Sequence, residues 1–99
     1  EHSFKLMKND SVLINTARGA IINEVHLTEA LKTGKIRGAA IDVMEHEPPS
    51  VDNQLCTLDN IIITDHRAYY SEESLKSLKE KCAGNALSVL KFGTAEYMV

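Results

Sequence analysis

The chain has 99 residues, of which 43% are hydrophobic and 25% are charged, and its formal net charge is -3. A chain of this length forms one small domain, and its acidic balance argues against a nucleic-acid binder. No apolar run approaches the ~20 residues that span a bilayer, and the N-terminal residues lack a signal-peptide pattern. We therefore expect a globular cytoplasmic protein that contacts neither a membrane nor nucleic acid.

Cysteine and histidine spacing gives no sign of a metal centre. Cys56 and Cys82 lie in different predicted elements without a CxxC spacing, so we expect two free thiols. The four histidines also lack the spacing of metal ligands. The sequence therefore predicts no metal site.

Three short apolar runs predict β-strands. They cover residues 11–15, 39–43 and 60–64, and polar or turn-forming residues follow each of them. The 23 residues between the first two runs leave room for a helix, and two strands joined in this way form a βαβ unit with parallel strands. We therefore predict an α/β fold with a parallel sheet.

Two amphipathic helices are predicted around these strands. The first follows the N-cap Asn23 and ends at Lys32, with Gly34 at its C-terminal end. Its expected apolar face consists of Val25, Leu27, Ala30 and Leu31. The second follows the N-cap Ser71, and its apolar residues recur at three- and four-residue spacing for about five turns. A long helix therefore follows the sheet.

A candidate functional side chain lies at or beyond the end of each predicted strand. Arg18 follows the first strand, Asp42 and Glu47 come with the second, and His66 follows the third. The carboxyl ends of parallel strands share one edge of the sheet, where open α/β sheets bind ligands. A histidine that faces a carboxylate is held in one tautomer and suits proton transfer, and an arginine can hold a carboxylate through two hydrogen bonds. The pattern is typical of an acid/base enzyme for a small carboxylate, and the alternative is a set of polar strand-end residues without a catalytic role.

The segment VLINTARGAIINEVHLTEALKTGKIRGAAIDVMEHEPP resembles the signature of the D-isomer-specific 2-hydroxyacid dehydrogenases. The family pattern is a strand, N-T-A-R-G, a helix, G-A-A-x-D-V, an acidic loop with E-P, and N-hydrophobic-T-P-H-x-A. The chain is similar to it from about Phe4 to Gly93, although Asp65 stands where proline usually precedes the histidine. The residues after the histidine are more similar to the D-lactate dehydrogenase and C-terminal-binding-protein branches than to the phosphoglycerate branch.

The resemblance implies an NAD-dependent oxidoreductase that reduces a 2-keto acid to a D-2-hydroxy acid. Arg18 would bind the carboxylate of the substrate, and His66 would be the acid/base. Glu47 would pair with His66 and raise its pKa, and Asp65 beside it would raise that pKa further.

The resemblance also implies which residues lie near the cofactor. Thr16, Ala17 and Arg18 would lie along the nicotinamide, with Asp42 beside the carboxamide and the acid/base histidine nearby. Two aromatic residues follow the third strand, and for them two roles stay open. They would either line the substrate side or pack as aromatic residues at a domain edge; they are Tyr69 and Tyr70.

The sequence contains no GxGxxG motif, so the glycine turn that cradles a dinucleotide pyrophosphate is missing. The resemblance implies that residues 1–70 are the C-terminal part of a Rossmann NAD-binding domain. Residues 71–92 would be a crossover helix, and residues 93–99 would start the return to the substrate domain. We therefore expect part of a longer enzyme, inactive alone, in which NAD cannot be told from NADP.

Half of a doubly wound sheet leaves a strand edge and an apolar face uncovered, so we also expect a homo-oligomer. The alternative function is an NAD(H)-sensing, corepressor-like binding protein that keeps the dehydrogenase fold.

Overall fold

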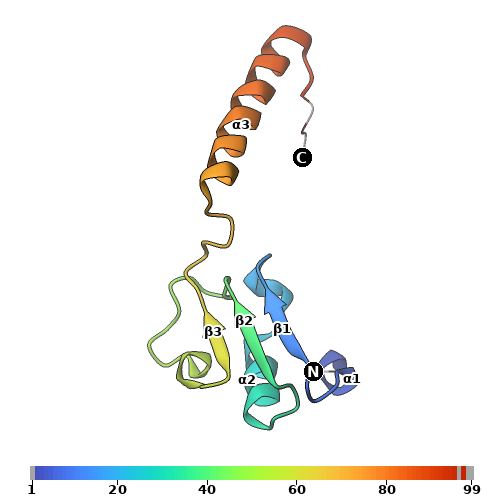
Figure 1. Cartoon of the computed structure of the whole chain (residues 1–99), viewed down its shortest axis with the longest axis vertical. Coiled ribbons are helices and arrows are strands. Elements are labelled where there is room, and N and C mark those ends of the chain that lie inside the picture. Colours follow the sequence, from blue (N-terminus) through green and yellow to red (C-terminus); the bar gives the residue numbers. More distant parts are fainter. Residues whose placement is uncertain (1, 96, 98–99) are drawn as a thin grey trace. The chain divides into compact units, whose positions relative to one another are not determined.

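The computed structural model of the chain describes residues 2–95 and 97, which form two compact units. The first unit ends at Ala68 and the second begins at Tyr69. The helices and strands of the first unit are labelled in Figure 1. In chain order they are α1 (His2–Leu6), β1 (Val12–Asn15), α2 (Glu24–Lys32), β2 (Gly38–Ile41) and β3 (Ile61–Ile63). Two short 3-10 turns, η1 (Gly19–Ile21) and η2 (Gln54–Thr57), follow β1 and β2.

The three strands form one parallel sheet in the order β1-β2-β3, which confirms the predicted α/β fold. Each strand is shorter than its predicted range. Asp42 and Thr64 nevertheless donate backbone N–H groups to the carbonyls of Asn15 and Ile41, at 2.9 and 3.0 Å. The hydrogen bonding of the sheet thus extends to Asp42 and Thr64, and the candidate functional residues lie at or beyond this edge.

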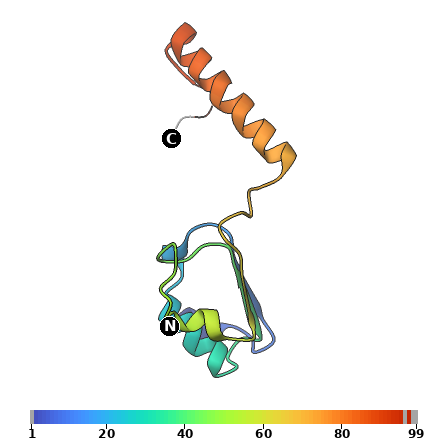
Figure 2. The same cartoon turned by 90° about the vertical axis from the view of Figure 1, so that its left-hand side faces the viewer.

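Helix α2 and the turn η2 lie on one face of this sheet (Figure 2) and bury the core against it. Three side chains are almost fully buried there: Leu27, Ile36 and Leu55. Burying a side chain of this size stabilises a fold by roughly 1.5–3 kcal/mol. The prediction that Val25 belongs to the apolar face is wrong, because Val25 is 73% exposed. It lies two residues from Leu27, which on a helix places it on a different face.

The other face of the sheet is apolar, and no described helix of the first unit lies over it (Figure 2). Ile14 pairs with Ala40, and Ala40 pairs with Ile62, so these three residues form one row across the strands. Ile14 and Ile62 are exposed, as is Val12 at the start of β1. Only one face of β1, that of Leu13 and Asn15, is therefore covered within the first unit.

The predicted helix ends are confirmed. The side chain of Asn23 accepts a hydrogen bond from the backbone N–H of His26 at 2.9 Å, as an N-cap does. Gly34 has a φ of 65°, the left-handed conformation in which glycine commonly ends helices. Ser71 caps the second long helix by accepting from the N–H of Ser74.

The second unit consists mainly of this helix, α3 (Glu72–Phe92). None of its side chains is buried within the unit, and its apolar positions include the exposed Leu78 and Leu90. None of the helices among the described residues is both long and apolar enough to cross a membrane. Of the predicted return segment 93–99, residues 96, 98 and 99 lie outside the described residues.

Candidate active site

The loop after β1 is shaped by the side chain of Asn15, the buried last residue of that strand. Its Oδ1 accepts from the backbone N–H of Ala17 at 3.1 Å, and its Nδ2 donates to the carbonyl of Arg18 at 2.9 Å. An asparagine commonly holds a turn in this way, by bonding to backbone two residues further along. Sequence analysis assigned Asn15 only to the strand, although an asparagine before a turn is a recognisable signal.

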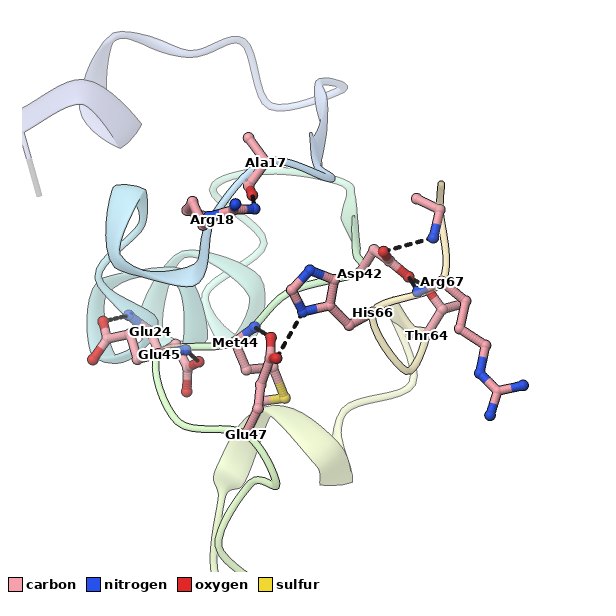
Figure 3. A network of polar contacts seen from close by, with 11 residues as sticks. Ala17, Arg18, Glu24, Asp42, Met44, Glu45, Glu47, Thr64, His66 and Arg67 are labelled. Carbon is pink, nitrogen blue, oxygen red and sulfur yellow. Dashed lines mark hydrogen bonds and ion pairs between the residues drawn. The ribbon is translucent and has the colours of Figure 1, made fainter. Parts of the chain in front are cut away.

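Glu47 and His66 form the central pair of the site (Figure 3). The Nδ1 atom of His66 lies 2.7 Å from Oε2 of Glu47, and Oε1 of Glu47 accepts from the backbone N–H of Met44 at 2.9 Å. The hydrogen bond with His66, followed by that from Met44, lowers the pKa of Glu47 below its ordinary value. The carboxylate of Glu47 is therefore ionised at neutral pH and can only accept hydrogen bonds, so Nδ1 of His66 carries the hydrogen. The other ring nitrogen of His66, Nε2, points away from Glu47.

Asp42 holds the segment that carries His66. Its carboxylate is 4% exposed and accepts from the hydroxyl of Thr64 and from the backbone N–H groups of Arg67 and Ala68. The two backbone bonds are 2.9 and 2.8 Å long. The hydrogen bond from Thr64, with those from the backbone of Ala68 and Arg67, lowers the pKa of Asp42. A carboxylate has about four acceptor positions, so these three donors leave about one for a ligand.

His66 itself has a φ of 58°, the left-handed backbone conformation that residues other than glycine rarely adopt. Such a conformation persists when the surrounding structure enforces it. The bonds that Asp42 accepts from residues on both sides of His66 provide this enforcement. The histidine is therefore held in place from the backbone as well as through Glu47.

A pocket of about 350 Å³ lies beside this pair. Its walls include Asp42, Glu47, Ile63 and His66. The two prolines at the end of the acidic loop, residues 45–49, also line it. This volume is within the range of small-molecule sites. A larger groove of about 910 Å³ lies along α2, and none of the predicted site residues lines it.

The loop of Thr16, Ala17 and Arg18 is exposed at the same end of the sheet. The guanidinium of Arg18 donates to the carbonyl of Ala17 at 2.7 Å. Among the described residues, no hydrogen bond or ion pair joins Arg18 to Glu47 or His66. The structure therefore brings Asp42, Glu47 and His66 together and leaves Arg18 turned back on its own loop.

The residues around His66 are placed as follows. Asp65 accepts from Nε of Arg67 at 2.8 Å, and both side chains are largely exposed. Tyr69 and Tyr70 belong to the second unit, where their rings make an edge-to-face contact with centroids 6.2 Å apart. In the part of the chain that the structure describes, no three histidine, cysteine, aspartate or glutamate side chains could hold a metal ion together.

Comparison with known proteins identifies the family. Residues 1–68 match the family described as D-isomer specific 2-hydroxyacid dehydrogenase, NAD binding domain. D-3-phosphoglycerate dehydrogenase of Methanocaldococcus jannaschii is 48% identical over 94 residues, which are 95% of this chain and 18% of that protein.

Solved structures of a dehydrogenase and a reductase also match the chain. D-lactate dehydrogenase of Lactobacillus jensenii with NAD+ has a TM-score of 0.81 and 30% identity, over 99% of this chain and 33% of that one. An NADPH-dependent glyoxylate/hydroxypyruvate reductase of Sinorhizobium meliloti, in complex with NADP and malonate, has a TM-score of 0.86 and 29% identity, over 97% of this chain and 30% of that one. This chain thus spans a third or less of the length of each of these three relatives. It belongs to the D-isomer-specific 2-hydroxyacid dehydrogenases and contains sequence of their NAD-binding domain.

Proposed function

We propose that this chain supplies the acid/base half of a dehydrogenase that interconverts a 2-keto acid and a D-2-hydroxy acid. The observation that carries the proposal is the 2.7 Å contact between Glu47 and His66 beside a pocket of about 350 Å³. Because Nδ1 of His66 faces Glu47, its Nε2 atom is free to exchange a proton with a substrate oxygen. An ionised carboxylate behind an imidazole stabilises the protonated ring, which the reduction direction needs as its acid.

The chain's residues fit the nicotinamide end of NAD. The loop of Thr16 and Ala17 is exposed at the carboxyl edge of the sheet, where such folds bind dinucleotides. Asp42 has about one acceptor position left, enough for one N–H of the carboxamide. The bound dinucleotide supplies or accepts the hydride at the substrate carbon. The residues that hold the pyrophosphate would come from outside this sequence, which has no GxGxxG motif.

Arg18 is proposed to bind the substrate carboxylate. Its guanidinium is exposed on the loop after β1, and among the residues that the structure describes its hydrogen-bond partner is the neighbouring Ala17 carbonyl, at 2.7 Å. Exchanging that single bond for two parallel bonds to a carboxylate is favourable, because charge-assisted pairs are about twice as strong as neutral ones. In reduction, His66 then protonates the carbonyl oxygen while Arg18 stabilises the charge that develops on it. Tyr69 and Tyr70 remain candidates for the substrate side.

The share of each relative that the chain covers supports a longer protein, with residues 71–92 as a crossover helix. The apolar row of Ile14, Ala40 and Ile62, in which the two isoleucines are exposed, supports a homo-oligomer or a further domain over that face. Sedimentation of the 99-residue chain at micromolar concentration tests self-association, and a clean monomer counts against it.

Turnover of 2-keto acids with NADH by the full-length protein tests the proposed chemistry. His66→Ala should lower kcat/KM by ~10²–10⁴-fold, the usual contribution of an acid/base group, and Arg18→Ala should chiefly raise KM. The matched controls are His2→Ala and Arg37→Ala, which remove the same side-chain types at exposed positions. Near wild-type turnover by His66→Ala contradicts the proposal. Tight NADH binding without turnover of any 2-keto acid favours the binding-protein alternative.

A further inference from the structure

Two glutamates outside the pocket make an unusual reciprocal contact. Glu24 is the first residue of α2, and Glu45 lies two residues before Glu47. The backbone N–H of Glu24 donates to Oε1 of Glu45 at 2.9 Å, and the backbone N–H of Glu45 donates to Oε1 of Glu24 at 2.6 Å. Figure 3 shows the two bonds side by side, next to the hydrogen bond between Met44 and Glu47.

Each bond satisfies a group that the local structure leaves open. The first N–H groups of a helix have no partner within the helix, and the carboxylate of Glu45 supplies one at the positive end of α2. The other oxygen of Glu24, Oε2, accepts from the side chain of Asn53 at 2.8 Å. Glu24 therefore joins three segments: α2, the acidic loop and the start of η2.

The acidic loop is the segment that this contact holds. The N–H of Met44 donates to Glu47, and the next N–H along the chain, that of Glu45, donates to Glu24. The backbone of Met44 and Glu45 also lies directly against Gly19, the residue after Arg18. The position of Glu47 is thus tied to the segment that follows Arg18.

We infer that Glu24 and Glu45 are positioning residues, whose paired bonds hold the acidic loop so that Glu47 meets His66. Neither of them lines the pocket beside His66. The expected effect of these two glutamates on turnover rests on the proposed function, whereas their effect on the Glu47–His66 contact does not.

The pKa of Glu47, followed by ¹³C NMR of its side chain in the 99-residue chain, measures the inference directly. Glu45→Ala should raise this pKa toward the ordinary 4.5, because a displaced loop weakens the bonds from His66 and Met44. Loss of the nearby negative charge of Glu45 would by itself lower the pKa of Glu47. The direction of the change therefore separates positioning from a charge effect.

Three further variants complete the test. Glu45→Gln keeps an oxygen that can accept from Glu24 and should restore the low pKa of Glu47. Glu29→Gln removes a charge from an exposed position of the same helix and should leave that pKa unchanged. If Glu45→Ala does not fold, Glu24→Ala replaces it, because it removes the oxygen that accepts from the N–H of Glu45. That variant should also raise the pKa.

In the full-length protein, Glu45→Ala should lower kcat by up to ~100-fold, the scale expected for a displacement of about 1 Å, and Glu45→Gln should recover it. An unchanged or lower Glu47 pKa in folded Glu45→Ala overturns the inference. A raised pKa in a protein without keto acid turnover instead supports the inference and refutes the proposed function.

Discussion

The contact between Gly19 and the acidic loop predicts a large effect of one added methyl group. Gly19 is buried, and a Cβ atom on it would lie 2.0 Å from the backbone carbon and oxygen of Met44 and 2.5 Å from the nitrogen of Glu45. Ordinary contacts begin at 3.4 Å, so the two backbones must separate by about 1.4 Å. They cannot relax through a side-chain rotation, because the atoms in contact belong to the main chain.

Gly19→Ala should therefore cost the fold about 1–3 kcal/mol, the usual penalty of overpacking. Urea unfolding of the 99-residue chain measures this loss. In the full-length protein the same shift separates Arg18 from Glu47, and a misplacement of about 1 Å can lower turnover ~100-fold. We expect the loss of kcat/KM to exceed what the fraction of unfolded protein explains.

Gly84→Ala is the matched control. Gly84 lies within α3, and a Cβ atom there would have no neighbour within 4 Å. Alanine favours a helix interior over glycine by up to about 1 kcal/mol, so this variant should leave the protein as stable or more stable. If Gly19→Ala unfolds at the wild-type urea concentration and keeps full turnover, the close approach of the two loops does not control the site.

Two further predictions concern the core and the acid response. Leu27→Ala should lower the free energy of unfolding by about 2–5 kcal/mol, because Leu27 is almost fully buried, whereas Val25→Ala should change it by less than ~0.5 kcal/mol. Urea unfolding compares the two, and equal losses would contradict the assigned core face of α2. The pKa of Glu47 lies below its ordinary 4.5 in the folded chain, so its contribution is full above pH 4.5 and is lost as the pH falls through the folded value. Urea midpoints measured below pH 4.5 should therefore fall less steeply for Glu47→Gln, and parallel curves for both proteins would argue against the pair with His66.

Local chemistry made several parts of the structure predictable. The N-caps Asn23 and Ser71 each bond to an N–H three residues away, and Gly34 adopts its left-handed conformation without help from distant residues. The family motif also led to Glu47 and His66, which the structure brings into contact. Such features depend on neighbours in the chain or on a pattern of residues, both of which the sequence carries.

Other features depend on which segments meet. Val25 and Leu27 are both apolar and lie on different faces of α2, and the packing of α2 on the sheet decides that the face of Leu27 is the buried one. Nothing in the sequence near Asp42 indicates that its carboxylate bonds the backbone on the far side of His66. The same is true of the left-handed conformation of that histidine, which its neighbours in the chain do not require.

The sequence by itself thus predicted the βαβ pattern and the helix ends, and its family motif led to Glu47 and His66, the proposed acid/base pair. The tertiary structure decided which distant groups bond to the segments that carry this pair: Asp42 accepts from residues 25 and 26 positions away, and Glu24 and Glu45 bond to each other across 21. The physical reason is that a hydrogen bond needs donor and acceptor within about 3 Å. For residues so far apart in the chain, only the folded backbone brings them that close.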